Sequence, residues 1–274
     1  MGPPLEQAFP RPSVLGVVNV TPDSFSDGGR FLAPDDAVAQ ARRLVEEGAA
    51  LVDVGAESTR PGSSGVSADE ELRRLEPVLE RLSGVPVSVD TSKAEVARRA
   101  LELGAVMVND VTALRADPAL AGVVAESGAY VCLMHMLGEP RTMQDEPRYE
   151  DVVSEVKAFL EERLAFAVAA GIPEGRICLD PGIGFGKTVE HNLELLARLG
   201  ELVAVGRPLL LGASRKRFLG RVLGDPDALT GPLAAGVAVA VLAYERGASL
   251  FRAHDVREHV EALAAARAIV GAPA

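Results

Sequence analysis

Four side chains that can bind an anion lie close to two apolar runs late in the chain. Ser214 and Lys216 follow one run, and Arg252 and His254 follow the next. Hydroxyl, ammonium, guanidinium and imidazole groups are donors that bind phosphate oxygens in proteins. In a chain with a formal charge of −11, such a local group of cations predicts that an anion is held there.

Two carboxylates and an amide follow earlier apolar runs. They are Asp90, Asn109 and Asp180. A carboxylate accepts two parallel hydrogen bonds and an amide both donates and accepts, so this set suits a flat heterocycle with an amino-amide edge. Each residue also has a structural interpretation as the cap of the next helix. Polar residues at every run, including Asn19 and Asp53, favour a shared site over capping alone.

The segment Asp180–Thr188 looks like a phosphate-binding loop but departs from both known patterns. Pro181 stands where G-x-x-x-x-G-K-[ST] requires its first glycine, and Lys187 stands where G-x-G-x-x-G needs its last. The residues around Ser214 lack the closing glycine of a serine nucleophile elbow, and the four histidines have no neighbour at metal-ligand spacing. The sequence therefore predicts no nucleotide loop, no covalent serine catalysis and no zinc hydrolysis.

Short runs rich in Val, Leu and Ile must form the strands that position these side chains. Such runs are typical of buried parallel strands. The eight runs are Val14–Val18, Leu51–Val54, Pro86–Val89, Val106–Val108, Tyr130–Met134, Ile177–Leu179, Pro208–Leu211 and Leu250–Phe251. The residues with candidate chemistry lie in these runs or shortly after them.

Segments with helical periodicity alternate with the runs. The clearest are Asp35–Glu47, Asp69–Leu82, Lys93–Leu103, Asp151–Ala170, Leu233–Arg246 and Val256–Val270. Many are followed by a glycine, the usual residue after a helix end. Strict alternation through eight units without a linker favours a single closed α/β barrel, the (β/α)8 TIM barrel, over an open doubly wound sheet. We expect this barrel domain over residues 14–274, after an N-terminal extension over residues 1–13.

The composition excludes several classes of partner. The 274 residues are 48% hydrophobic and 24% charged, as in an ordinary globular protein. The charge of −11 repels a phosphate backbone or an acidic membrane surface, so we expect neither nucleic acid nor a membrane as partner. Without a signal-peptide pattern or a long apolar stretch, a cytoplasmic protein is expected. Cys132 and Cys178 lie in apolar runs and are expected to be buried thiols.

The polar segments, taken in chain order, resemble those of the dihydropteroate synthase family. The matching motifs are NVTPDSFSDGG from Asn19, ESTRPG from Glu57, SVDT from Ser88, Asn109-Asp110, DPGIGF from Asp180, SRK from Ser214 and Arg252-x-His254-Asp255. The resemblance runs from Val14 to Val270. It implies a folate-pathway transferase that joins 6-hydroxymethyl-7,8-dihydropterin diphosphate to p-aminobenzoate and releases pyrophosphate and 7,8-dihydropteroate.

The resemblance also implies roles for individual residues. The pterin would be bound by Asp90, Asn109, Asp180, Lys216 and Met134. The diphosphate would be bound by Asn19, Arg252 and His254, with Asn19 acting through a Mg2+ ion. The p-aminobenzoate pocket would consist of Thr59, Arg60, Pro61, Phe185, Ser214 and Lys216. The residues implied in catalysis are Asn19, Lys216, Arg252 and His254.

Two stretches rich in Gly and Ser are predicted to act as lids. They are Thr21–Gly29 and Ser58–Gly65, and their closure would exclude water from the site. In the first stretch, the resemblance implies that Phe25, with Ser26 and Asp27, closes over p-aminobenzoate.

The implied reaction needs no enzyme nucleophile. Mg2+, Arg252 and His254 would stabilise the leaving diphosphate, while the electron-rich ring supports cationic charge on its methylene before the aryl amine attacks. The resemblance further implies a homodimer packed through the late helices Leu233–Arg246 and Val256–Val270. Two alternatives stay open: a folate-dependent methyltransferase domain with a similar barrel, and a non-catalytic pterin-binding protein.

Overall fold

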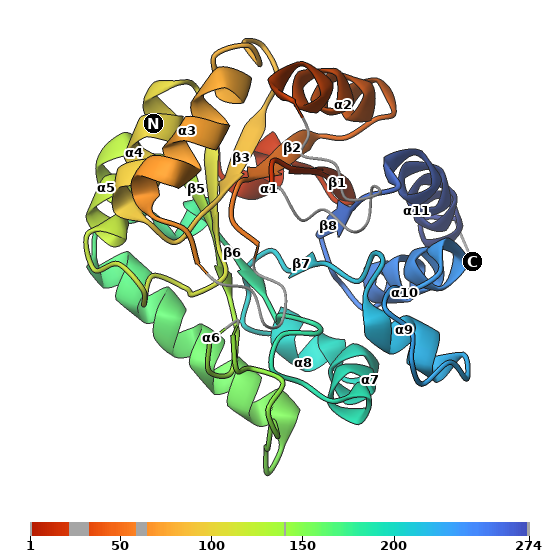
Figure 1. The fold of residues 1–274 in the computed structure, drawn as a ribbon. Helices are drawn as coiled ribbons and strands as arrows, with labels where there is room; N and C mark the ends of the chain where they lie inside the picture. Colours follow the sequence, from red (N-terminus) through yellow and green to blue (C-terminus); the bar gives the residue numbers. More distant parts are fainter. Residues whose placement is uncertain (1, 22–32, 59–64, 140, 273–274) are drawn as a thin grey trace.

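The structure, a computed structural model, describes residues 2–21, 33–58, 65–139 and 141–272. Its eight strands pair in parallel in the order β6-β5-β4-β3-β2-β1-β8-β7, and a bridge between Leu179 and Leu209 joins the two ends of this order. The strands are β1 (Ser13–Asn19), β2 (Leu51–Gly55), β3 (Val87–Asp90), β4 (Met107–Asp110), β5 (Tyr130–Met134), β6 (Ile177–Asp180), β7 (Leu210–Leu211) and β8 (Leu250–Ala253). The sheet thus closes into a barrel (Figure 1).

The helices that follow the strands surround the barrel, whereas α1 precedes β1 (Figure 1). The helices are α1 (Leu5–Ala8), α2 (Pro34–Glu46), α3 (Ala68–Leu79), α4 (Ala94–Glu102), α5 (Leu120–Ser127), α6 (Val152–Ala169), α7 (Val189–Ala197), α8 (Leu199–Val203), α9 (Arg217–Val222), α10 (Leu233–Glu245) and α11 (Val256–Val270), with a short 3-10 turn, η2, at Glu174–Arg176. The prediction of a single (β/α)8 barrel is confirmed. In the described part of the chain, no helix has the length and apolar character needed to span a membrane.

Local sequence explains where these elements begin and end. Strands β2 and β5 are buried at every position, as the apolar runs predict for strands covered on both faces. Helix α3 begins after Ser67, whose side chain accepts a hydrogen bond from the backbone N–H of Glu70. Gly48 and Gly247 follow helix ends at φ angles of +103° and +108°, which glycine adopts without steric cost.

Residues near the N-terminus close one end of the barrel. Leu5 of α1 is fully buried, and it clusters with Phe9 and with residues near the beginnings of the strands. The Tyr130 hydroxyl donates a hydrogen bond to the Pro3 carbonyl at 2.8 Å. The predicted N-terminal extension therefore contributes to the core at the end opposite the candidate site, while the domain boundary at residue 14 stays a prediction.

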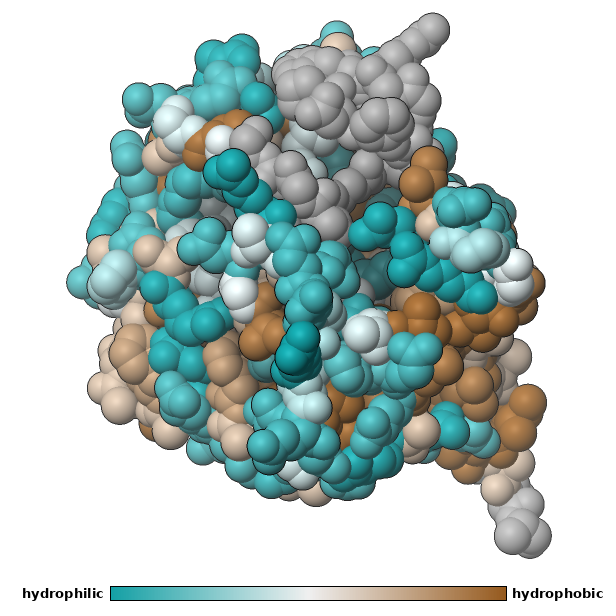
Figure 2. All heavy atoms as spheres, turned by 60° about the horizontal axis from the view of Figure 1, so that its bottom comes forward, coloured by the Kyte–Doolittle hydropathy of each residue, from teal (hydrophilic) through white to brown (hydrophobic). Residues whose placement is uncertain are grey.

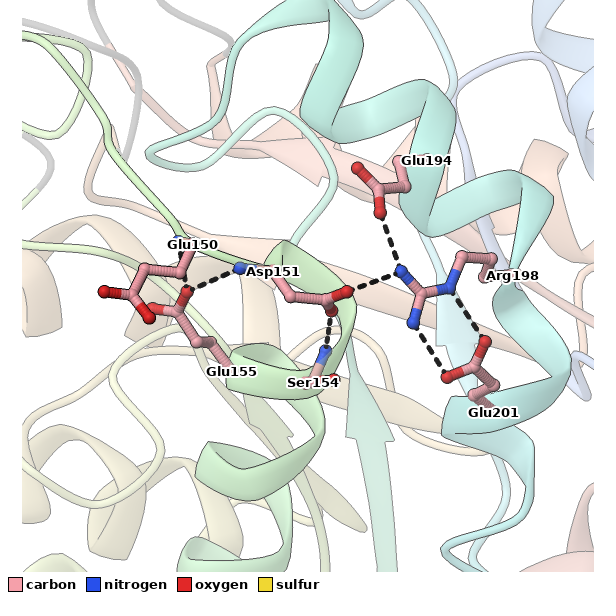
Figure 3. A network of polar contacts seen from close by, with 7 residues as sticks. All are labelled: Glu150, Asp151, Ser154, Glu155, Glu194, Arg198 and Glu201. Atoms are coloured by element: carbon pink, nitrogen blue, oxygen red, sulfur yellow. Dashed lines mark hydrogen bonds and ion pairs between the residues drawn. The ribbon is translucent and has the colours of Figure 1, made fainter.

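An ion-pair network ties α6 to α7 and α8 (Figure 3). Asp151 caps α6 by accepting from the Ser154 N–H at 2.7 Å, and it also accepts from the Arg198 guanidinium at 2.8 Å. Arg198 donates further to Glu194 of α7 at 2.7 Å and to Glu201 of α8 at 2.8 and 3.0 Å. The network therefore anchors α7, the helix that follows the segment after β6.

Candidate active site

The carboxyl ends of the strands bring the predicted pterin residues to one end of the barrel. Asp90, the last residue of β3, is the register partner of Asn109 in β4. Asp180, the last residue of β6, is the register partner of Met134 at the end of β5. Asn109, Met134 and Asp180 are all buried. Because the strands are parallel, these side chains lie at the end where such barrels bind ligands.

Arg252 of β8 lies between two carboxylates at this end. Its Nε donates to Asp53 Oδ2 at 2.6 Å, and its terminal nitrogen donates to Asp90 Oδ2 at 3.0 Å. Burial works against the charge of the guanidinium, but Asp53 and Asp90 together hold the pKa of Arg252 above its usual value. One guanidinium group therefore pairs with two carboxyl groups, although its charge balances only one carboxylate.

Asp53 is a site residue to which the sequence analysis gave no role. Its side chain is fully buried, and Oδ2 accepts from Asn109 Nδ2 at 3.1 Å as well as from Arg252. Among the residues that the structure describes, its Oδ1 has no hydrogen-bond partner. The sequence did contain a signal for a role of Asp53, because it is a carboxylate inside the apolar run Leu51–Val54. An acidic residue within a buried strand requires a partner.

The protonation of Asp90 is set by its surroundings. Burial and the nearby Asp53 charge raise the pKa of Asp90 to about 8, although Arg252 acts in the opposite direction. A carboxyl group with this pKa exchanges a proton near neutral pH. Asp90 can therefore change its charge when a ligand brings donors to it.

Asp180 and Lys216 form a second pair of opposite charges. Burial raises the pKa of Asp180, Lys216 opposes this shift, and Asp180 Oδ1 accepts from the Gly182 N–H at 2.7 Å. Burial lowers the pKa of Lys216 to about 8, and Asp180 opposes that shift in turn. The Lys216 ammonium donates to the Ile183 carbonyl. The site thus offers both an acceptor and a donor, as recognition of a heterocycle edge requires.

Phe185 lies beside Lys216 in the segment after β6. The Lys216 Nζ is 4.9 Å from the centroid of the Phe185 ring. The half-buried ring packs against a small apolar cluster made by Val111, Met134, Met136 and Met143. An aromatic face next to an ammonium group suits a ligand ring that carries a negative substituent.

The segments after β7 and β8 are joined by side chains. Ser214 Oγ lies 3.2 Å from His254 Nδ1 and accepts from the His254 N–H at 3.2 Å. Arg215 donates to both oxygens of Asp255, at 3.1 and 2.7 Å. Arg215 has a φ angle of +58°, a strained conformation for a residue with a side chain. The bidentate pair joins the segment after β7 to the segment after β8, where Ser214 contacts His254.

The other predicted residues are only partly described. Asn19 ends β1, is half-buried, and is the register partner of Gly55. The predicted lid residues Phe25, Ser26 and Asp27, and the predicted p-aminobenzoate residues Thr59, Arg60 and Pro61, lie outside the described residues. Within the described ranges, no group of three or more His, Cys, Asp or Glu side chains could hold a metal ion.

Fold and site together define a class of protein. A (β/α)8 barrel carries buried carboxylates, an amide and a lysine next to an arginine and a histidine at the carboxyl ends of its strands. This set can hold a flat heterocycle that bears an anionic substituent.

Comparison with known proteins identifies the family. The sequence profile described as "Pterin binding enzyme" matches residues 15–254. The dihydropteroate synthase of Escherichia coli (strain K12) is 47% identical over 266 residues, which cover 95% of this chain and 93% of that protein. The chain belongs to the pterin-binding enzyme family and, within it, to the dihydropteroate synthases, as the motifs predicted.

Two solved structures show the same fold. Xanthomonas albilineans dihydropteroate synthase with 4-aminobenzoic acid superimposes with a TM-score of 0.88 at 47% identity and covers 100% of both chains. The enzyme from the same organism in complex with 7,8-dihydropteroate gives a TM-score of 0.84 at 46% identity, over 96% of this chain and 95% of that one.

Proposed function

We propose that the protein joins 6-hydroxymethyl-7,8-dihydropterin diphosphate to p-aminobenzoate in folate biosynthesis. This proposal rests on one observation: two acceptors for a pterin, Asp90 and Asp180, lie at the same end of the barrel as the cations Lys216 and Arg252. The homologous enzyme from X. albilineans binds 4-aminobenzoic acid and, in another structure, 7,8-dihydropteroate. A methyltransferase would not need the cations for a diphosphate.

The pterin half of the site would work by matched hydrogen bonds. Asp180 accepts from the amino-amide edge of the ring, and Lys216 donates to the ring carbonyl and N5 side. Asp90 and Asn109 complete the acceptors and donors around the ring. Since Asn109 and Asp180 are buried and the Asp90 side chain is only 11% exposed, an unpaired group would be costly, and the site therefore favours the complementary heterocycle.

The reaction exchanges one bond at the pterin methylene for another. The C–O bond to the diphosphate breaks as Arg252 and His254 stabilise the developing negative charge. The nitrogen lone pair of p-aminobenzoate then forms the C–N bond, and the amine loses a proton. Phe185, Ser214 and the stem of Lys216 hold the aryl ring and its carboxylate. The positions given to Thr59, Arg60, Pro61 and the lid around Phe25 remain part of this proposal.

Mg2+ is the proposed cofactor, and Asn19 is its proposed ligand. The amide oxygen at the end of β1 is a hard donor of the kind that Mg2+ accepts, and the ion commonly takes its other ligands from water and substrate phosphates. When bound, Mg2+ neutralises charge on the leaving diphosphate.

We further propose that the enzyme acts as a homodimer in the cytoplasm. Exposed apolar side chains, including Leu223, Leu242 and Ile269, lie on α10, α11 and the end of α9. Figure 2 shows apolar surface on the side of the molecule where Figure 1 has these helices. The free thiols of Cys132 and Cys178 accord with a reducing compartment.

Pyrophosphate release tests the proposed reaction. With Mg2+ present, we expect release only when both the pterin diphosphate and p-aminobenzoate are supplied. EDTA should abolish it, and Asn19→Ala should raise the Mg2+ concentration needed for half-maximal rate. Release that does not depend on p-aminobenzoate would contradict the proposed transfer, and a rate unaffected by EDTA would contradict the metal assignment.

A further inference from the structure

Side chains, rather than a strand ladder, hold the carbonyl groups of the strand-6 loop, defined here as residues 181–187. Lys187 donates to the carbonyls of Gly182 and Phe185, at 3.1 and 3.0 Å. Gln144 donates to Gly184 at 2.7 Å, and the Tyr149 hydroxyl donates to Gly186 at 2.8 Å. With Lys216 on Ile183, all carbonyls from 182 to 186 have a side-chain donor.

Lys187 lies beneath this loop and faces away from solvent. It is 3% exposed, and its Nζ is 2.9 Å from His135 Nδ1 in addition to the two carbonyls. Burial lowers the pKa of Lys187, and burial together with Lys187 lowers the pKa of His135 to about 2, so the imidazole is neutral. In a phosphate-binding loop, the lysine points to the anion. Here it points to carbonyl oxygens of its own loop.

The two carbonyls that Lys187 binds bracket the part of the loop that meets the candidate site. Between them lies Ile183, which accepts from Lys216, and the second belongs to Phe185, whose ring stands beside Lys216. Gly184 and Gly186 flank Phe185 with φ angles of +82° and +62°. A loop of this kind has many accessible conformations, so external hydrogen bonds decide which one is populated.

Asp180 does not depend on Lys187 in the same way. Its backbone belongs to β6, where its carbonyl accepts from the His135 N–H at 2.9 Å, and Met134 is its register partner. The strand ladder therefore fixes the backbone of Asp180, and its carboxylate accepts from the Gly182 N–H at the start of the loop, whereas the carbonyls of the loop rely on side-chain donors.

We propose that Lys187 is a positioning residue for the p-aminobenzoate half of the site: its three hydrogen bonds hold Phe185 and the Ile183 carbonyl in place against Lys216. The proposal rests on the proposed function. It assigns a role to Lys187, the basic residue of the motif Asp180–Thr188, which contacts His135 and carbonyls of its own loop. It follows that Lys187 sets the affinity for p-aminobenzoate and leaves that for the pterin substrate almost unchanged.

Lys187→Met removes all three hydrogen bonds while keeping an unbranched side chain. We expect the KM for p-aminobenzoate to rise about tenfold or more, and the calorimetric Kd for the pterin diphosphate to change less than about twofold. Lys157→Met, on the exposed surface of α6, is the matched control and should leave both values unchanged. A Lys187 variant with an unchanged KM, or with both affinities weakened equally, would overturn the proposal.

A double-mutant cycle separates positioning from general loss of structure. If Lys187 acts through Phe185, the KM of Lys187→Met/Phe185→Ala should be within about twofold of that of Phe185→Ala alone. Fully additive effects would show that Lys187 does not act through the ring. If the parent protein makes no dihydropteroate from both substrates, the proposed function fails, a result distinct from an active parent whose Lys187 variant keeps its KM.

Tyr149→Phe decides the question if Lys187→Met does not fold. It deletes one hydroxyl, the donor to the Gly186 carbonyl next to Phe185. We expect a rise of about threefold in the KM for p-aminobenzoate, with the Tm within about 2 °C of the parent. An unchanged KM in this variant would contradict the idea that side-chain donors position the loop.

Discussion

At the scale of single residues, the candidate site depends on two carboxyl groups that share one cation. Arg252 contacts both Asp53 and Asp90, and because one cation balances only one carboxylate, Asp90 keeps a proton below its pKa of about 8. A ligand that brings N–H donors favours the ionised form of Asp90, whereas a ligand without donors leaves buried carboxyl groups unpaired. The same residues that select a pterin thus make its binding sensitive to pH and to single substitutions.

Replacing Asp180 should weaken the pterin substrate selectively. Asp180→Asn turns one acceptor into a donor that faces a donor, and about 3 kcal/mol of binding free energy, or roughly a hundredfold in Kd, should be lost. Calorimetric titration with the pterin diphosphate measures this. Asp227→Asn, on the exposed surface, serves as control. An unchanged Kd would mean that the pterin binds elsewhere.

Binding of the pterin substrate should depend on pH through Asp90. With a pKa of about 8, the free carboxyl is largely protonated at lower pH, and it must lose this proton to accept an N–H from the ligand. Affinity should therefore rise as the pH increases towards about 8, with proton release on binding, and fall above it as Lys216, whose pKa is also about 8, loses its charge. Calorimetry in buffers of different ionisation enthalpy detects the proton, and Asp90→Asn should abolish its release. Equal proton release by both proteins would disprove the assignment.

At the scale of elements, the N-terminal helix and the barrel depend on each other. Leu5 of α1 is fully buried among residues near the strand beginnings. The side chain lies far along the barrel from Asp180 and Arg252, which stand at the strand ends. The stability of the barrel and the chemistry of the site can therefore be separated by substitution.

Leu5→Ala should destabilise the protein without changing its kinetics. Loss of a fully buried leucine side chain costs about 3 kcal/mol through lost burial and the cavity that remains. Urea unfolding measures the loss, and steady-state kinetics at a temperature where both proteins are folded should give the same KM values. Gln7→Ala, at an exposed position of the same helix, should leave both unchanged. A large change in KM for Leu5→Ala would argue against the separation.

Periodic apolar segments were predictable, and contacts between distant segments were not. The helices at Leu233–Glu245 and Val256–Val270 lie within a residue of their predicted ends. Helix α5, at Leu120–Ser127, was not predicted, because its eight residues show too short a periodic pattern. The bond from Arg252 to Asp53 spans 199 residues and arises only when the barrel closes, so the sequence placed both at strand ends without pairing them.

At the scale of the whole molecule, self-association should depend on the late helices. Leu242 of α10 and Ile269 of α11 are 48% and 75% exposed. Charged side chains at a packed apolar interface are strongly unfavourable. Leu242→Glu/Ile269→Glu should therefore shift the protein from dimer to monomer in analytical ultracentrifugation, while Arg246→Glu, an exposed and already charged position on the same side, is the control. A parent protein that is monomeric at micromolar concentration would contradict the proposed dimer.

The central claim is that one site brings a pterin diphosphate and p-aminobenzoate together and joins them. Mass spectrometry of a reaction with isotopically labelled p-aminobenzoate tests it most directly. The account predicts labelled 7,8-dihydropteroate and pyrophosphate in equal amounts, and loss of the product with Asp180→Asn. If the purified protein instead bound the pterin without forming labelled product, or transferred a methyl group from a reduced folate, the account would be contradicted.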